Sequence, residues 1–183
     1  GEHKIHSEFT PSMGGLSIFL GAMVTLLMSF SLQDWITLKY FFVSLSLMFI
    51  IGLRDDILAL SPKQKLASQF LPVFVLVLLG KTLLQSTYGL GGQFIFPEAI
   101  SIGLTIFVLI ILTNAYNLID GLDGLAGAIG FICLVFFGFW FSQIGDTSLS
   151  IISFLFSGSL LAFLFFNWQP SRIFMGDTGA LMI

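Results

Sequence analysis

Long, continuous apolar runs restrict the fold of this chain more than any other feature. Six of them, each about 15 to 20 residues long, recur along the 183 residues and are separated by short polar segments. A helix needs about 20 mostly apolar residues to cross a bilayer, and runs without alternation exclude the pattern of a transmembrane β-barrel. We therefore predict an all-α, polytopic transmembrane helical bundle. The runs lie at 13–32, 38–53, 66–80, 99–116, 126–142 and 149–166, and a seventh begins near Gly179.

The composition agrees with a membrane protein. Hydrophobic residues make up 56% of the chain and charged residues only 9%, whereas soluble domains carry about 25% charged residues. We expect the lipid bilayer as a partner and no nucleic acid. The one cysteine, Cys133, excludes an intrachain disulfide. Within the third run, Pro72 is expected to kink the helix.

Counting the runs assigns the polar segments to two sides of the membrane. Segments 1–12, 54–65, 117–125 and 167–178 fall on one side, which holds five basic residues against two on the other. The positive-inside rule makes that side cytoplasmic. The basic residues there are Lys4, Arg54, Lys63, Lys65 and Arg172, against Lys39 and Lys81 opposite.

The segment Asn114–Leu125 is unusually polar for the mouth of a membrane helix. It combines two carboxamides with the carboxylates Asp120 and Asp123. Charged side chains are energetically costly near a membrane interior, so a cluster of them there indicates function. Such oxygens suit Mg²⁺, which also keeps waters and takes phosphate oxygens. The interspersed glycines allow the backbone to approach a ligand closely.

Two further acidic segments fall on the same predicted side. Asp55 and Asp56 are adjacent and repel each other, which a divalent cation or a cationic substrate would relieve. Asp177 stands between glycines before a helix, and helix N-termini favour phosphate. Lys65 follows a helix start at Ser61-Pro62. Together these residues indicate a metal-and-phosphate site, although a solvated helix end for the paired acids is the simpler alternative.

Five segments resemble the polyprenyl-phosphate N-acetylhexosamine-1-phosphate transferase superfamily, and they occur in family order over nearly the whole chain. They lie at 4–15, 52–56, 61–66, 114–125 and 167–179. Lys4-Ile-His6 and the Asn-Trp-Gln-Pro at 167–170 are more similar to the bacterial undecaprenyl-phosphate GlcNAc-1-phosphate transferase branch than to the lipid I synthase, phospho-MurNAc-pentapeptide translocase. The resemblance implies one membrane-embedded domain over 1–183, a fragment without the family's first helix and C-terminal region.

The resemblance also implies an activity. The enzyme would transfer a sugar-1-phosphate from a UDP-sugar to undecaprenyl phosphate and release UMP. The branch that the chain resembles more implies that the transferred group is GlcNAc-1-phosphate. This is the first membrane step of cell-envelope polysaccharide synthesis, such as lipopolysaccharide or cell-wall biogenesis. The enzyme would use Mg²⁺, with Mn²⁺ as an alternative. It would be a multi-pass protein of the bacterial inner membrane with its active site facing the cytoplasm.

Family likeness further implies roles for the polar residues. Asn117 and Asp177 would be the metal ligands. Asp55 would orient or deprotonate the lipid phosphate, and Asp56 would support it by positioning Lys65. Lys65 would hold a phosphate.

The remaining candidates lie in Asn114–Leu125. Asp120 would shape the loop or the metal site and is counted with the catalytic residues. Asp123 would contact the uracil, and Asn114 is a further substrate-binding candidate.

Three alternatives remain open on sequence alone. The first is lipid I synthesis, and the second is a non-catalytic membrane relative that acts as a scaffold. The third, a transporter or channel, would need acids at mid-span, whereas each Asp and Glu lies near a predicted helix end. The choice of UDP-sugar stays open, and so does a homodimer, because the Gly-rich run 126–142 could pack within or between chains.

Overall fold

The computed structural model describes residues 12–90, 92, 94–169 and 171–183. These residues form α-helices and one π-helical segment, and none of them belongs to a β-strand ladder longer than an isolated bridge. The predicted all-α class is confirmed for this part of the chain. The elements are α1 Gly14–Ser29, α2 Leu32–Thr37, α3 Lys39–Leu58, α4 Pro62–Phe74, the π-helix Val75–Leu79, α5 Glu98–Ile119, α6 Leu125–Gln143, α7 Thr147–Asn167 and α8 Gly176–Ala180.

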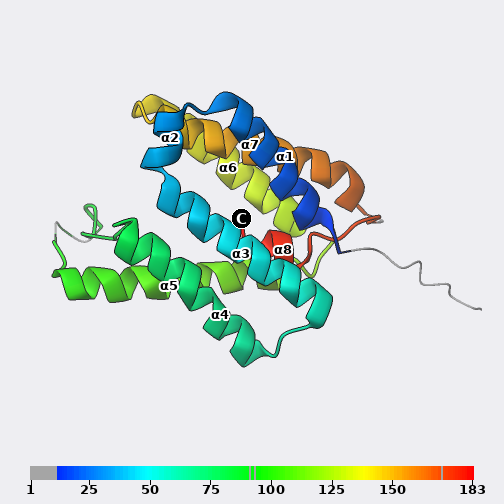
Figure 1. Cartoon of the computed structure of the whole chain (residues 1–183), viewed down its shortest axis with the longest axis horizontal. Helices are drawn as coiled ribbons and strands as arrows, with labels where there is room; N and C mark the ends of the chain where they lie inside the picture. The colour runs from blue at the N-terminus through cyan, green and yellow to red at the C-terminus, as the bar shows by residue number, and fades with distance from the viewer. Residues whose placement is uncertain (1–11, 91, 93, 170) are drawn as a thin grey trace, which may run out of the picture.

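The helices form two groups joined by α3 (Figure 1). In the first group, α6 packs along α7 and α1 packs on the same helix. In the second, α4 packs on α5, and α3 contacts α4 and the π-helix. The five-residue α8 packs against both α3 and α1. This short helix therefore sits where the two groups meet.

Two apolar clusters hold these groups together. The larger lies between α1 and α7 and includes the fully buried Leu26 and Leu160. The smaller joins α3, α4, the π-helix and α5 through Met48, Val73 and Ile110. Burial of such side chains stabilises a helix pair by about 1.5–3 kcal/mol per residue in water; within lipid, close packing takes over that role.

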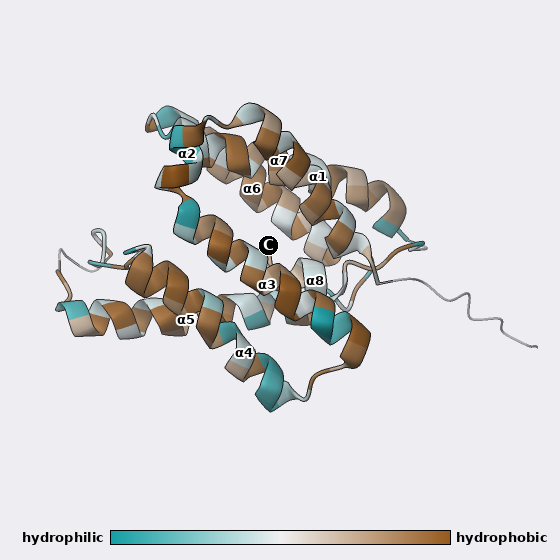
Figure 2. Cartoon of the chain, in the orientation of Figure 1, coloured by the Kyte–Doolittle hydropathy of each residue, from teal (hydrophilic) through white to brown (hydrophobic). Residues whose placement is uncertain are grey.

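Within the described residues, three helices are long and apolar enough to cross a membrane: α5, α6 and α7. Only 17% of the apolar window of α5 and 22% of that of α6 is buried, so most of their apolar surface is free to face lipid. Figure 2 shows the hydrophobic colour extending along these helices. The predicted count of six spans is not confirmed. Among the remaining helices, α1 is only 16 residues long, and α3 ends in three charged residues at 54–56.

The structure corrects two predicted loops. The polar segment at 54–65 was expected to begin where the second apolar run ends, but α3 continues to Leu58, and α4 then begins at Pro62 as predicted. Similarly, α5 continues past the fourth run to Ile119, so half of Asn114–Leu125 lies on that helix. Apolar runs end where charge begins, whereas a helix continues as long as its backbone hydrogen bonds do. Several candidate side chains are consequently held on helices.

Local sequence explains the start of α4 and its distortion. Ser61 and Gln64 form a reciprocal capping box, and Pro62 stands at the first turn, as predicted. The irregularity expected from Pro72 appears as the π-helix that follows α4. The amide of Val75 bonds to both Leu71 and Pro72 carbonyls, and the Ser44 hydroxyl donates to the Pro72 oxygen at 2.9 Å.

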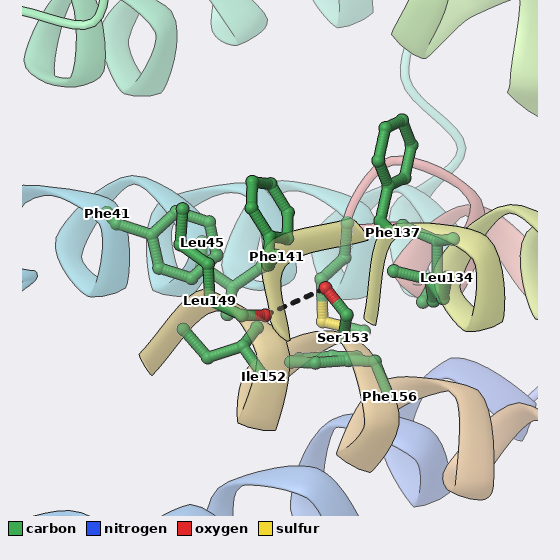
Figure 3. Close-up of a pocket in the computed structure, with 11 residues that line it drawn as sticks. Phe41, Leu45, Leu134, Phe137, Phe141, Leu149, Ile152, Ser153 and Phe156 are labelled. Carbon is green, nitrogen blue, oxygen red and sulfur yellow. Dashed lines mark hydrogen bonds between the residues drawn. The ribbon is translucent and has the colours of Figure 1, made fainter. Parts of the chain in front are cut away.

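One cavity of about 300 Å³ lies between α3, α6 and α7 (Figure 3). Its lining is almost entirely apolar and includes Phe41, Leu134 and Phe156. The Ser153 hydroxyl within it donates to the carbonyl of Leu149 at 2.8 Å. No charged residue lines this cavity, so it offers no acid, base or phosphate ligand.

Candidate active site

Four side chains from four elements meet around one ammonium group. Lys65 Nζ lies 3.0 Å from Asp55 Oδ2 and 3.1 Å from Asn117 Oδ1, and it also contacts Asp177 Oδ1. We call this group the Lys65 junction: Lys65, Asp55, Asn117 and Asp177. It brings together α3, α4, α5 and α8. The three acidic segments, which the sequence predicts on one side of the membrane, thus contact one another through this junction.

Local backbone structure places Asp55 and Lys65 at the junction. Asp55 lies in the last turns of α3, beyond its apolar part, and its Oδ1 accepts the Leu60 amide at 2.6 Å. That bond folds the chain back after Ala59, whose φ of 42° is left-handed. The capping box at Ser61 then starts α4, and Lys65 is one turn inside it. The short connection between α3 and α4 thus places the Asp55 carboxylate opposite the Lys65 ammonium.

The adjacent carboxylate has a different role. Asp56 accepts the amides of Asp177 at 2.8 Å and Thr178 at 2.9 Å, and it also bonds to the Thr178 hydroxyl. An acid at a helix N-terminus satisfies unpaired amides there. The expectation that Asp56 positions Lys65 is wrong, because Asp55 makes that contact. Adjacent residues on a helix point about 100° apart, so the two acids face different partners.

Glycines allow α8 to approach the acids this closely. Gly176 has a φ of 73°, and a Cβ there would lie 2.8 Å from Asp56 Oδ2. A Cβ on Gly52 would lie 2.6 Å from the Thr178 Cα, because α8 rests directly on α3 at that point. Sequence reasoning did not give Gly52 a role. The sequence feature that could have pointed to Gly52 is its position one helical turn before Asp55-Asp56.

Charge and burial act in opposite directions within the junction. Burial raises the pKa of Asp55, but hydrogen bonds from the Leu60 amide and the Lys65 ammonium outweigh it, and the pKa ends below its usual value. Burial likewise lowers the pKa of Lys65, while bonds to Asp177 and Asp55 raise it above its usual value. Both groups are therefore ionised at neutral pH.

Asp120 lies at the end of α5 beside this group. Burial raises the pKa of Asp120 to about 7, and the charges of Asp177 and Asp56 add to the effect, while the Gly176 amide opposes it. Asp120 makes no ion pair with a described residue. It is thus a carboxyl that gains or loses a proton near neutral pH beside the junction.

The two other candidates are not part of the junction. The Asp123 carboxylate accepts the amide and hydroxyl of Ser171, at 3.3 and 3.0 Å, and is exposed. The Asn114 amide donates to Gln69 Oε1 at 2.7 Å, and Gln69 is fully buried. Asn117, Asp120 and Asp123 are spaced by three, but the helix ends among them and they separate.

A second polar connection was missed from sequence. Asn167 is only 4% exposed; its Oδ1 accepts the Gly124 amide and its Nδ2 donates to the Ile173 carbonyl, both at 2.9 Å. We call these three residues the Asn167 junction. It ties the loop after α5 to the loop before α8. Its signals were an Asn at the end of an apolar run and the place of Asn167 in the segment 167–179 that resembles the superfamily, but no role was assigned to it.

The donor set of the Lys65 junction fits a hard cation. Two carboxylate oxygens and one carboxamide oxygen converge on a single positive group, and Mg²⁺ prefers such ligands. Among the residues that the structure describes, no three His, Cys, Asp or Glu side chains form a metal-binding group. Only a cation that keeps several waters or takes ligands from a substrate suits the donors present. Lys4 and His6 lie outside the described residues.

Comparison with known proteins gives relatives of one kind. A protein of Bacillus subtilis (strain 168) named probable undecaprenyl-phosphate N-acetylglucosaminyl 1-phosphate transferase is 33% identical, over 98% of this chain and 50% of its own length. Phospho-N-acetylmuramoyl-pentapeptide-transferase of Clostridium botulinum (strain Alaska E43 / Type E3) is 33% identical, over 95% of this chain and 56% of its own.

A third relative is the decaprenyl-phosphate N-acetylglucosaminephosphotransferase of Mycolicibacterium smegmatis (strain ATCC 700084 / mc(2)155). It is 32% identical, over 100% of this chain and 49% of its own length. The chain thus spans about half the length of the curated relatives that it matches. Residues 38–183 match the sequence profile of glycosyl transferase family 4 and include every member of the Lys65 and Asn167 junctions. The resemblance inferred from the motifs is confirmed, and the chain belongs to glycosyl transferase family 4.

Proposed function

We propose that this protein transfers a sugar-1-phosphate, GlcNAc-1-phosphate, from a UDP-sugar to undecaprenyl phosphate. An oxygen of the lipid phosphate attacks the β-phosphorus of the UDP-sugar. The bond from that phosphorus to the bridging oxygen breaks, and UMP leaves with the oxygen. The product is a lipid-linked diphosphosugar.

The observation that carries this proposal is the Lys65 junction. Phosphoryl transfer between two anions depends on charge neutralisation and positioning, and the junction concentrates one cation and three oxygen donors from four helices. The side chains are only partly buried: Lys65 is 17% and Asp177 28% exposed, so substrates can reach them. The names of the relatives, all transferases that act on phosphate-linked carriers or amino sugars, support the same reaction type.

The charged residues have different roles in the proposed reaction. Asp55, ionised and fixed by the Leu60 amide, orients the lipid phosphate or accepts its proton. Lys65 binds a phosphate oxygen, and Asp56 holds α8 in place and with it Asp177. Asp123 is exposed, and its carboxylate contacts the uracil after giving up its hydrogen bonds to Ser171. Asp120 holds a proton beside the reacting groups.

Asp177 and Asn117 are the residues that would hold Mg²⁺, or Mn²⁺ in its place. Bound there, the cation would neutralise the diphosphate and polarise its oxygens. Asn114 would act indirectly, since its amide is bonded to Gln69. The site would face the cytoplasm of the bacterial inner membrane, as the distribution of basic residues predicts.

Phospho-MurNAc-pentapeptide transfer, which makes lipid I, is the second candidate function. One observation favours it: a relative of that name is as similar, at 33% identity, as the GlcNAc-1-phosphate relative. The two functions share the acceptor and the leaving UMP, so they differ only in the sugar.

A turnover assay separates the two. The purified whole protein is incubated with undecaprenyl phosphate, Mg²⁺ and one UDP-sugar at a time, and UMP is measured. We expect release with UDP-GlcNAc and not with UDP-MurNAc-pentapeptide; the reverse would select lipid I synthesis. Asp177→Asn should abolish release, while Glu98→Gln, an exposed acid at the other end of α5, removes the same charge and should not. Release from neither sugar would refute the proposed reaction.

A further inference from the structure

The ammonium of Lys65 has no hydrogen-bond capacity left for a phosphate. A lysine ammonium has three donors. Here its partners are also three: Asp55 Oδ2 at 3.0 Å, Asn117 Oδ1 at 3.1 Å and Asp177 Oδ1. In this arrangement Lys65 cannot add a phosphate oxygen without giving up a carboxylate or the carboxamide. The residue proposed to bind substrate is thus held by the proposed metal ligands.

The same geometry prevents a divalent cation from using those oxygens. The ammonium lies against Asp177 Oδ1 and Asn117 Oδ1, the two atoms that would ligate the metal. Asn117 is fixed further, because its Nδ2 donates to the same Asp177 oxygen at 2.5 Å. Two cations this close in a partly buried site repel strongly. A metal and the ammonium cannot both occupy this position.

We propose that Lys65 acts as an internal counter-ion that holds the metal position in the metal-free protein and is displaced when the divalent cation binds. The displaced ammonium stays on α4, one turn from the helix start, and becomes available to the anionic substrate. Metal binding and phosphate binding are then coupled through one side chain. By linkage, each strengthens the other by the same factor. This inference rests on the proposed function, since it takes the metal and the phosphate from it.

The arrangement has a physical reason. Without a cation, the carboxylates of Asp55 and Asp177 would repel each other in a site where Asp55 is only 6% exposed. An uncompensated buried charge is strongly destabilising. The lysine keeps the four helices together before the metal arrives, and its flexible stem lets it move afterwards.

The test measures metal binding rather than turnover. Mn²⁺ is titrated into the purified whole protein without substrate, and free Mn²⁺ is followed by electron paramagnetic resonance. Lys65→Met removes the competing ammonium, so the Kd for Mn²⁺ should fall roughly 3- to 100-fold, the range that coupling between groups in contact gives. Lys63→Met is the matched control, because it removes the same charge from an exposed position two residues away on α4. Asp177→Asn should weaken binding.

A second measurement needs no variant. Amine-reactive labelling of the wild-type protein, read by mass spectrometry, should increase at Lys65 when Mg²⁺ is added and stay constant at Lys63. Equal or weaker Mn²⁺ binding in Lys65→Met than in Lys63→Met would overturn the inference, and so would unchanged labelling of Lys65.

The two failures are distinguishable. If the wild type still releases UMP in a Mg²⁺-dependent way while Lys65→Met binds Mn²⁺ no more tightly, only the displacement by metal is wrong. If the wild type neither binds Mn²⁺ nor releases UMP, the proposed function fails together with the inference.

Discussion

The Lys65 junction and the Asn167 junction lie at the same end of the bundle but are built in opposite ways. The first uses charged groups, of which Lys65 is 17% and Asp177 28% exposed while Asp55 is buried. The second uses one neutral side chain, 4% exposed, bonded only to backbone. Neutral buried hydrogen bonds fix geometry, whereas charged groups at a solvent-accessible site can exchange partners. The difference separates a junction that stabilises the fold from the junction that we propose takes part in the reaction.

The largest effect is expected in the charged junction. Asp55→Asn keeps the shape and an acceptor for the Leu60 amide, but it removes the charge that faces Lys65. UMP release should fall by roughly 100- to 1,000-fold, as when one oriented group of a phosphoryl or acyl site is lost. The unfolding midpoint should change less than in the Asn167 variant below. Turnover within a few-fold of wild type would remove Asp55 from the reaction.

The neutral junction should show the reverse pattern. Asn167→Ala leaves the Gly124 amide and the Ile173 carbonyl without their partner. Each unsatisfied buried group costs about 1–3 kcal/mol, so the stability loss from the two groups should be about 2–6 kcal/mol. It is measured by denaturant unfolding in detergent, with the exposed Gln169→Ala as control. A stable Asn167→Ala protein with no turnover would instead place Asn167 in the chemistry.

The close packing of α8 on α3 at Gly52 provides a third comparison, between two Gly→Ala variants. Gly52→Ala would put a Cβ 2.5 Å from the Asp177 carbonyl oxygen, so α8 must shift. Overpacking of this kind costs about 1–3 kcal/mol, and it should lower turnover as well, since Asp177 moves. Gly103→Ala in α5 has nothing within 4 Å of the new Cβ and should be neutral or slightly stabilising. Equal behaviour of the two variants would show that α8 does not rest on Gly52.

The smallest effect concerns pH. Because burial raises the pKa of Asp120 to about 7 from an unfolded value near 3.8, the folded state favours the protonated acid. That contribution to stability is complete below about pH 4 and is lost as the pH rises through about 7. With EDTA present, Asp120→Asn should therefore match wild type at about pH 4. At pH 8 it should melt roughly 3 °C higher, and a constant difference across this range would contradict the shift.

The predictions from sequence held where local or compositional signals were strong. The all-α class follows from the continuous apolar runs, and the capping box at Ser61 and the irregularity after Pro72 follow from single residues. Alternating the runs across a membrane predicted that the segments of Asp55, Asn117 and Asp177 share one side, and the structure shows that these side chains meet. The span count and the loop limits were less accurate, because hydropathy marks charge and not the end of backbone hydrogen bonding.

By itself, the sequence determined that this is a helical membrane-type chain with its acids near the predicted helix ends, seven of the ten on one predicted side, since charge is costly within lipid. Only the tertiary structure decided what each acid contacts. Asp55 faces Lys65 while its neighbour Asp56 caps α8, and Asn167 joins two loops. These partners lie 6 to 122 positions apart along the chain. A local connection places Lys65 opposite Asp55, but the packing of the helices brings the distant partners within bonding distance.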